Sequence, residues 1–130
     1  MGTTATLCDY QVLMGGSFTL NAATPDRERT LNFEVPSDFE FGTGARRPIL
    51  AFKITPLENS RFSVFLNSRK ITEPSFNESH TRGYWEAFSA ATPFPEGASF
   101  PNPVPLRIVM SQGSARFEDV IMWYQIKRDG

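Results

Sequence analysis

Hydrophobic and polar residues alternate along most of this chain, with a period of two. A period of two places every second side chain on the same face of a β-strand. The segments 30–36, 47–56, 60–68 and 104–112 show it most clearly, and each is predicted to be a strand with one face toward a core. The apolar faces are Leu31, Phe33 and Val35; Leu50, Phe52 and Ile54; Phe62, Val64 and Leu66; and Leu106, Ile108 and Met110.

The last such segment, ARFEDVIMWYQIK at 115–127, departs from this pattern. It alternates at first and then carries five apolar residues in succession, from Val120 to Tyr124. A strand that is apolar on both faces is either central in a sandwich or covered by another segment or chain. The sequence leaves both explanations open.

Turn-forming residues separate the strands at short intervals, and two longer loops span 67–83 and 92–105. No helical period persists for more than two turns. A chain of 130 residues fits a single domain. We therefore predict an all-β fold, a two-sheet antiparallel β-sandwich of about eight strands with jelly-roll topology and no major helix, formed by residues 1–130.

Residues 48–127 resemble the galactose-binding-domain-like jelly rolls. The resemblance lies in FSVFLNS at 62–68, YWEAF at 84–88 and FPEGASFPNPVPLRIVM at 94–110, followed by a long final strand that carries aromatic residues. Asn67 and Ser68 stand where Asn-Gly is usual. The resemblance implies the fold, and it implies binding rather than catalysis. Many members bind sugars through loops at one end, often beside a structural calcium ion, and others serve as docking modules.

Charge and the first residues narrow the possible partners and the compartment. The net charge of −1 gives no basic surplus to neutralise phosphates, so we expect no nucleic-acid partner. No run approaches the roughly 18 apolar residues that span a bilayer, so we expect no membrane partner. The start, MGTTATLCDY, lacks the basic and apolar regions of a signal peptide. We expect synthesis in the cytoplasm without a signal peptide, with later release or extracellular assembly left open.

The segment SHTRGYWEAF at 79–88 is the candidate ligand-binding site. In a carbohydrate site, Trp85 or Tyr84 would stack on a sugar ring while Arg82, His80 and Glu86 bond its hydroxyls. A simpler interpretation makes Tyr84 the start of a strand, with Trp85 on one face and Glu86 on the other. Only 79–83 would then be free to form a site.

Catalysis and metal binding have little support in the sequence. His80 is the single histidine and Cys8 the single cysteine, so no zinc ligand set and no disulfide can form within the chain. No G-x-S-x-G motif is present. We therefore expect no catalytic residues, no cofactor and no metal. A structural calcium ion stays open, because acidic residues occur at Asp26, Glu28, Asp38 and Glu40.

Two functions from different classes follow. The first is a non-catalytic, lectin-like module that binds carbohydrate through end loops of the sandwich. A single sugar site is usually weak, so this module would gain from a homo-oligomer. The second is a structural subunit of a homo-oligomeric, fibre or capsid-type assembly. Its partner would be protein, bound through the final strand and the loop 92–105.

Overall fold

The computed structural model describes residues 4–40, 48–76, 84–89 and 101–129. These residues form antiparallel strands and turns, and the described ranges contain no helix. None of the described residues forms a helix long and apolar enough to cross a lipid bilayer. The strands are β1 (Thr4–Asn21), β2 (Glu28–Phe33), β3 (Phe39–Glu40), β4 (Ile49–Pro56), β5 (Ser60–Leu66), β6 (Arg69–Thr72), β7 (Ser75–Phe76), β8 (Tyr84–Ser89), β9 (Val104–Gln112) and β10 (Ser114–Asp129).

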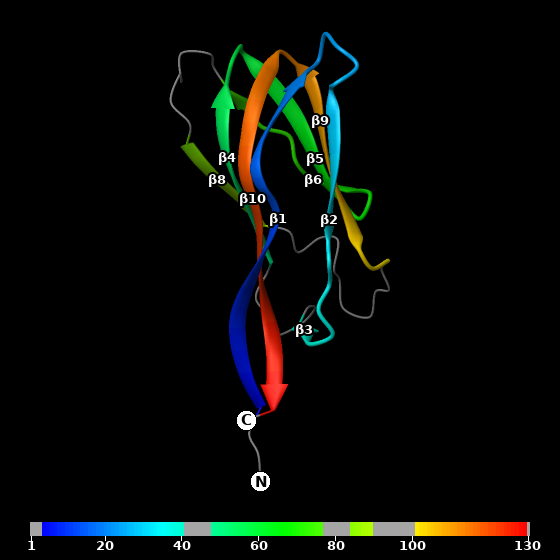
Figure 1. Cartoon of the computed structure of the whole chain (residues 1–130), viewed down its shortest axis with the longest axis vertical. Helices are drawn as coiled ribbons and strands as arrows, with labels where there is room; N and C mark the ends of the chain where they lie inside the picture. Colours follow the sequence, from blue (N-terminus) through cyan, green and yellow to red (C-terminus); the bar gives the residue numbers. More distant parts are fainter. Residues whose placement is uncertain (1–3, 41–47, 77–83, 90–100, 130) are drawn as a thin grey trace.

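The strands make two sheets with the topology of a jelly roll (Figure 1). Sheet A has the order β1-β10-β4-β8, with β3 pairing with β10, and sheet B has the order β2-β9-β5-β6, with β7 pairing with β5. Without the two-residue strands β3 and β7, the sheets read first-eighth-third-sixth and second-seventh-fourth-fifth in chain order. This alternation of the chain between two sheets is the double Greek key of a jelly roll. The predicted fold class is confirmed.

The core lies between the sheets and consists of the faces that the alternation predicts. The apolar residues of β4, β5 and β9 named above are 0–2 % exposed. In β2, Leu31 and Phe33 are buried, and Val35 just beyond it packs against the core from a half-buried position. Aromatic rings fill the centre: the ring centroid of Phe117 lies 5.0 Å from that of Phe62 and 5.6 Å from that of Phe52. Burial of large rigid rings is the main source of stability for such a sandwich.

A β-bulge in β10 explains the five apolar residues in succession. Glu118 pairs with Lys53 and Ile121 with Ala51. The same stretch of the sheet therefore spans three residue steps along β10 but only two along β4. Asp119 occupies this bulge with a φ of 50°. The extra residue shifts the alternation, so Phe117 is buried before the bulge and Val120, Met122 and Tyr124 are buried after it. β10 is a central strand, as one of the two explanations proposed, and Ile121 and Trp123 lie on its outer face.

The prediction of a long loop over 67–83 is wrong in its first part, because β6 and β7 lie there and pair with β5. The turn between β5 and β6 consists only of Asn67 and Ser68. Both residues have left-handed backbones, with φ of 51° and 63°. Two consecutive residues of this kind make the two-residue hairpin connection that best matches the twist of the flanking strands. The amide of Asn67 also donates to the carbonyl oxygen of Pro105 at 3.1 Å, which fastens the turn to β9.

Candidate functional site

The structure describes the side chains of two of the five predicted site residues. His80 and Arg82 lie outside the described residues, and Tyr84 is the first residue of β8, with a side chain that is also outside them. Trp85 and Glu86 are described and alternate along β8, with Trp85 54 % exposed and Glu86 half-buried. Glu86 pairs with Phe52, whose side chain is in the core, so Glu86 belongs to the inner side of the sheet. A ligand lying on Trp85 would therefore not be reached by Glu86.

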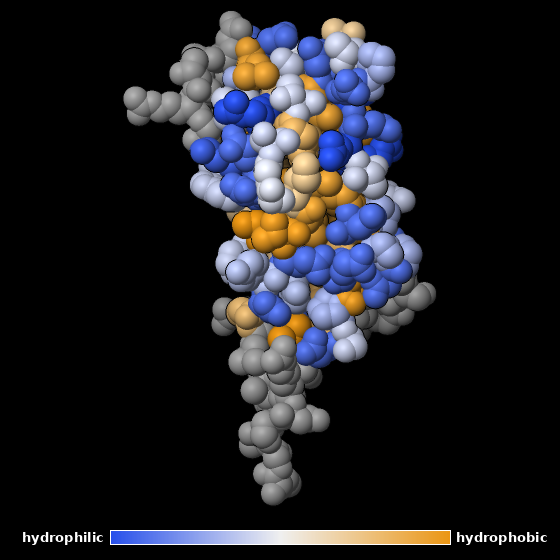
Figure 2. Space-filling model, in the orientation of Figure 1, coloured by the Kyte–Doolittle hydropathy of each residue, from blue (hydrophilic) through white to orange (hydrophobic). Residues whose placement is uncertain are grey.

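Trp85 is part of a larger apolar surface on the outer face of sheet A. The register places Tyr10 beside Trp123 and Trp123 beside Ile49, and one row further along it places Val12 beside Ile121 and Ile121 beside Ala51. We call this surface the aromatic face. Its exposed large residues are Tyr10, Val12, Ile49, Trp85 and Trp123, and half-buried Ile121 lies among them. Figure 2 shows one face of the molecule, with its largest group of hydrophobic residues near the middle and smaller groups toward both ends among hydrophilic residues.

Two of the aromatic residues form a pair that spans β1 and β10. The ring centroids of Tyr10 and Trp123 lie 5.0 Å apart, with an angle of 41° between the ring planes. Both rings stay accessible, since Tyr10 is 53 % and Trp123 43 % exposed. Packing against each other limits the rotation of both side chains, so they present a preformed apolar surface to a ligand.

Trp85 lies at the other end of the aromatic face, among charged neighbours. Its partner across the strand pair is Lys53, which in turn pairs with Glu118 on β10. The carboxylate of Glu118 accepts a hydrogen bond from Nε of Arg116 at 3.0 Å. Trp85 lies two strands across the sheet from Trp123 and four residue steps along the strand direction. With standard sheet spacings this separation is about 16 Å. Charged groups therefore border the apolar surface on the Trp85 side.

The aromatic face can hold a ligand with both apolar patches and hydroxyl groups. Exposed rings bind apolar C–H surfaces, and the nearby ammonium, guanidinium and carboxylate groups bind hydroxyls.

Sequence reasoning identified Trp85 but missed Tyr10 and Trp123. The run from Val120 to Tyr124 contained Trp123, but the bulge decides which of its residues face outward.

Of the acidic residues considered for calcium, Glu40 has a side chain outside the described ones. In the described part of the chain, no three His, Cys, Asp or Glu side chains are grouped to hold a metal ion. Glu28 instead accepts hydrogen bonds from Arg107 on the neighbouring strand, at 2.8 Å from Nη2 and 3.2 Å from Nε. This carboxylate is therefore already used in an ion pair.

Comparison with known proteins gives a likeness of fold. No protein-family model matches the sequence, and no curated protein is similar to it. Dimeric latent PorU from Porphyromonas gingivalis is similar in structure, with a TM-score of 0.50 and 15% identity over 98% of this chain. This chain spans only 13% of the PorU chain.

Two smaller domains are similar at lower scores. The C-terminal CBM6 of LamC, a marine laminarinase from Zobellia galactanivorans, has a TM-score of 0.42 and 8% identity, covering 83% of this chain and 98% of its own. The CBM36-1 domain of a multidomain xylanase from the hindgut metagenome of Trinervitermes trinervoides has a TM-score of 0.44 and 7% identity, covering 92% and 96%. Together with the strand order above, the likeness to PorU establishes a β-sandwich shared with known proteins.

Proposed function

We propose that this protein is a non-catalytic carbohydrate-binding module that holds a glycan against the aromatic face of sheet A. The observation that carries the proposal is the exposure of Trp85 and Trp123, with Tyr10 packed beside Trp123. A contiguous exposed surface of large apolar residues, unlike a single exposed residue, marks a site for a ligand or a partner. The proposal assigns the same role as that of the CBM6 and CBM36 domains, but it depends on these rings and not on that likeness.

An open sheet face suits an extended glycan chain better than a single sugar. A single sugar is usually bound in a concave pocket that surrounds it, whereas Trp85 and Trp123 are about 16 Å apart on a pleated surface. A chain of several sugars can reach both rings at once. Each ring would stack on the apolar face of one sugar, and Lys53 would bond hydroxyls near Trp85.

The loop before β8 extends this site in the proposal. His80 and Arg82 precede Trp85 by five and three residues in the chain, so they remain the proposed partners of sugar hydroxyls. Tyr84 remains an alternative stacking residue. Recognition through the end loop and recognition on the sheet face then belong to one site, with Trp85 at the junction of the two.

Binding to a panel of neutral polysaccharides, measured by affinity electrophoresis and titration calorimetry, tests the proposal. We expect Trp85→Ala and Trp123→Ala each to weaken binding by about tenfold or more, because exposed aromatic residues usually carry most of the energy of such contacts. Leu57→Ala is the matched control, since Leu57 is equally exposed but lies in the turn after β4. Failure of every glycan to bind, or equal binding by the Trp variants and the control, would refute the proposal.

The same face supports a second candidate function, the subunit of a homo-oligomer. Val12, Ile49 and Ile121 are aliphatic residues that gain from burial against protein but offer little to a sugar. A second copy could cover them. Light scattering distinguishes the two functions: a concentration-dependent oligomer that Val12→Glu converts to monomer, without any glycan binding, supports the subunit.

A further inference from the structure

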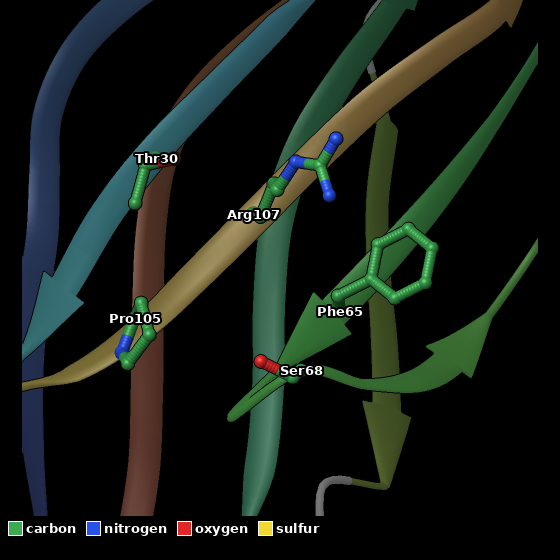
Figure 3. Close-up of a pocket in the computed structure, with 5 residues that line it drawn as sticks. All are labelled: Thr30, Phe65, Ser68, Pro105 and Arg107. Atoms are coloured by element: carbon green, nitrogen blue, oxygen red, sulfur yellow. The ribbon is translucent and has the colours of Figure 1, made fainter. Parts of the chain in front are cut away.

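The outer face of sheet B contains a hollow of about 200 Å³, on the opposite side of the sandwich from the aromatic face. Its lining residues come from three strands and a turn: Thr30 on β2, Pro105 and Arg107 on β9, Phe65 on β5, and Ser68 in the turn after β5. Figure 3 shows these side chains around the hollow. The volume is below the roughly 300 Å³ of most drug-sized sites, so it suits a single sugar ring.

Two cations flank the aromatic ring of this hollow. Cζ of Arg107 lies 5.7 Å from the ring centroid of Phe65, and Nζ of Lys70 lies 5.9 Å from it. The attraction of each cation to the ring, together with the two hydrogen bonds from Arg107 to Glu28, fixes the orientation of the guanidinium. A guanidinium has five N–H groups, and the bonds to Glu28 use one on Nε and one on Nη2. Among the described residues, this leaves the two N–H groups of Nη1 and the second N–H of Nη2 for a ligand, so the outer edge of the guanidinium can donate two parallel hydrogen bonds.

The surroundings of Phe65 carry more positive than negative charge. In the described part of the chain, the ion pairs beside Phe65 join three cations, Arg61, Lys70 and Arg107, to two carboxylates, Glu28 and Glu73, so these pairs hold one more positive than negative charge. Glu73 is 3.4 Å from Nη2 of Arg61 and 3.4 Å from Nζ of Lys70, and these two cations lower the pKa of Glu73, so it is ionised at neutral pH. The remaining positive charge favours an anionic group over a cationic one.

Ser68 is held in a backbone conformation that glycine adopts more readily. Its φ is 63°, and the second position of this kind of turn usually carries glycine. A left-handed backbone is strained for a residue other than glycine, and such strain is often associated with function. Here the residue that carries the strain also supplies a hydroxyl to the hollow.

We propose that this hollow binds one acidic sugar, a hexuronate ring within a glycan. Its apolar face lies against Phe65 and Pro105, its carboxylate accepts hydrogen bonds from Arg107, and its hydroxyls bond Thr30 and Ser68. The planar guanidinium matches a carboxylate group, which accepts two parallel hydrogen bonds. This site is separate from the aromatic face, so it does not depend on the function proposed above.

The test titrates the full chain with three probes: trigalacturonate, its methyl ester and a sulfated galactotriose. We expect trigalacturonate to bind with an affinity that falls as salt is added, and the methyl ester to bind at least tenfold more weakly because it lacks the charge. Stronger binding of the sulfated sugar than of trigalacturonate would overturn the assignment to a carboxylate. Equal binding of acid and ester, or no binding of the acid, would overturn the proposal.

Two variants locate the site. Arg107→Gln is expected to weaken trigalacturonate binding by tenfold or more, whereas Arg116→Gln, which removes a similarly exposed and similarly paired arginine from sheet A, leaves it unchanged. Ser68→Gly separates binding from folding, because we expect it to raise the melting temperature while it weakens binding. Unchanged binding in both Arg107→Gln and Ser68→Gly would overturn the proposal. Trp85→Ala should leave trigalacturonate binding intact, whatever it does to neutral glycans.

Discussion

The rings of Tyr10 and Trp123 contact each other on the outer face of sheet A, although the residues are more than a hundred positions apart in the sequence. The contact exists because β1 and β10 pair from Thr4 with Asp129 to Asn21 with Ser114. The first and last long strands of the chain therefore build one surface together. Aromatic pairs at such distances stabilise proteins beyond the burial of their area.

A double-mutant cycle measures this contact. We expect Tyr10→Ala and Trp123→Ala to be coupled by about 0.5–1.5 kcal/mol in the free energy of unfolding, measured by urea denaturation of both single variants and the double variant. The two truncations remove the same contact, so the double variant should lose less than the sum. Additivity within about 0.3 kcal/mol would show that the rings do not stabilise each other in solution.

Gly113 connects β9 to β10, and we expect an alanine at this position to destabilise the protein. Its φ is 68°, and a Cβ atom at this position would collide with the backbone carbonyl of Asn59. We expect Gly113→Ala to lower the free energy of unfolding by about 1–3 kcal/mol or more. The control is Gly15→Ala, whose Cβ would meet only Cγ1 of Val12 at an ordinary 3.4 Å and should change stability by at most about 0.5 kcal/mol. Equal melting temperatures for the two variants would contradict the strained turn.

Phe117 is the central ring of the core and is predicted to be the most costly to truncate. It is fully buried, and its ring contacts those of Phe18, Phe52 and Phe62. Phe117→Ala should lower the free energy of unfolding by about 3–5 kcal/mol, because it leaves a cavity between the sheets. Val12→Ala, on the exposed aromatic face, should change it by about 0.5 kcal/mol or less. A loss below about 1 kcal/mol for Phe117→Ala would mean that the sheets close over the cavity.

Stability is predicted to fall in alkaline solution because of Tyr124. Burial of its phenol against the rings of Phe33 and Phe39, followed by the negative charges of Asp9 and Asp38, raises the pKa of Tyr124 above its usual value of 10.0. A raised pKa means that the folded protein favours the neutral phenol. The stabilising contribution of the neutral phenol is therefore complete below about pH 10, where the unfolded chain also keeps the proton. It is lost as the pH rises through the pKa that Tyr124 has in the folded protein.

Thermal denaturation across the alkaline range, together with phenolate absorbance, measures this effect. Tyr124→Phe keeps the ring and removes the phenol, so it should make the decline in melting temperature above pH 10 shallower. An identical alkaline decline in the variant would assign the loss of stability to other groups.

The local pattern of the sequence was enough to predict which residues of the regular strands are buried. Leu50, Phe52 and Ile54 could be assigned to the core because alternation with a period of two is a property of a short segment and needs no knowledge of its partner. The segment 67–83 was predicted to be a loop, whereas Asn67 and Ser68 form a two-residue turn and β6 and β7 follow it by pairing with β5. A strand over 84–88 with Trp85 and Glu86 on opposite faces was predictable from the alternation, but the pairing of β8 with β4 decided that Trp85 faces outward.

The surfaces that these strands build depend on how the strands pair in the folded protein. Trp123 reaches the aromatic face because the bulge at Asp119 shifts the alternation, and the bulge exists in the pairing of β10 with β4, not in β10 alone. The hollow on sheet B likewise brings together Thr30, Phe65 and Arg107 from three strands that are distant in the chain. Strand pairing is set by how all the apolar faces close over one core, and that is a collective property which no single stretch of residues encodes.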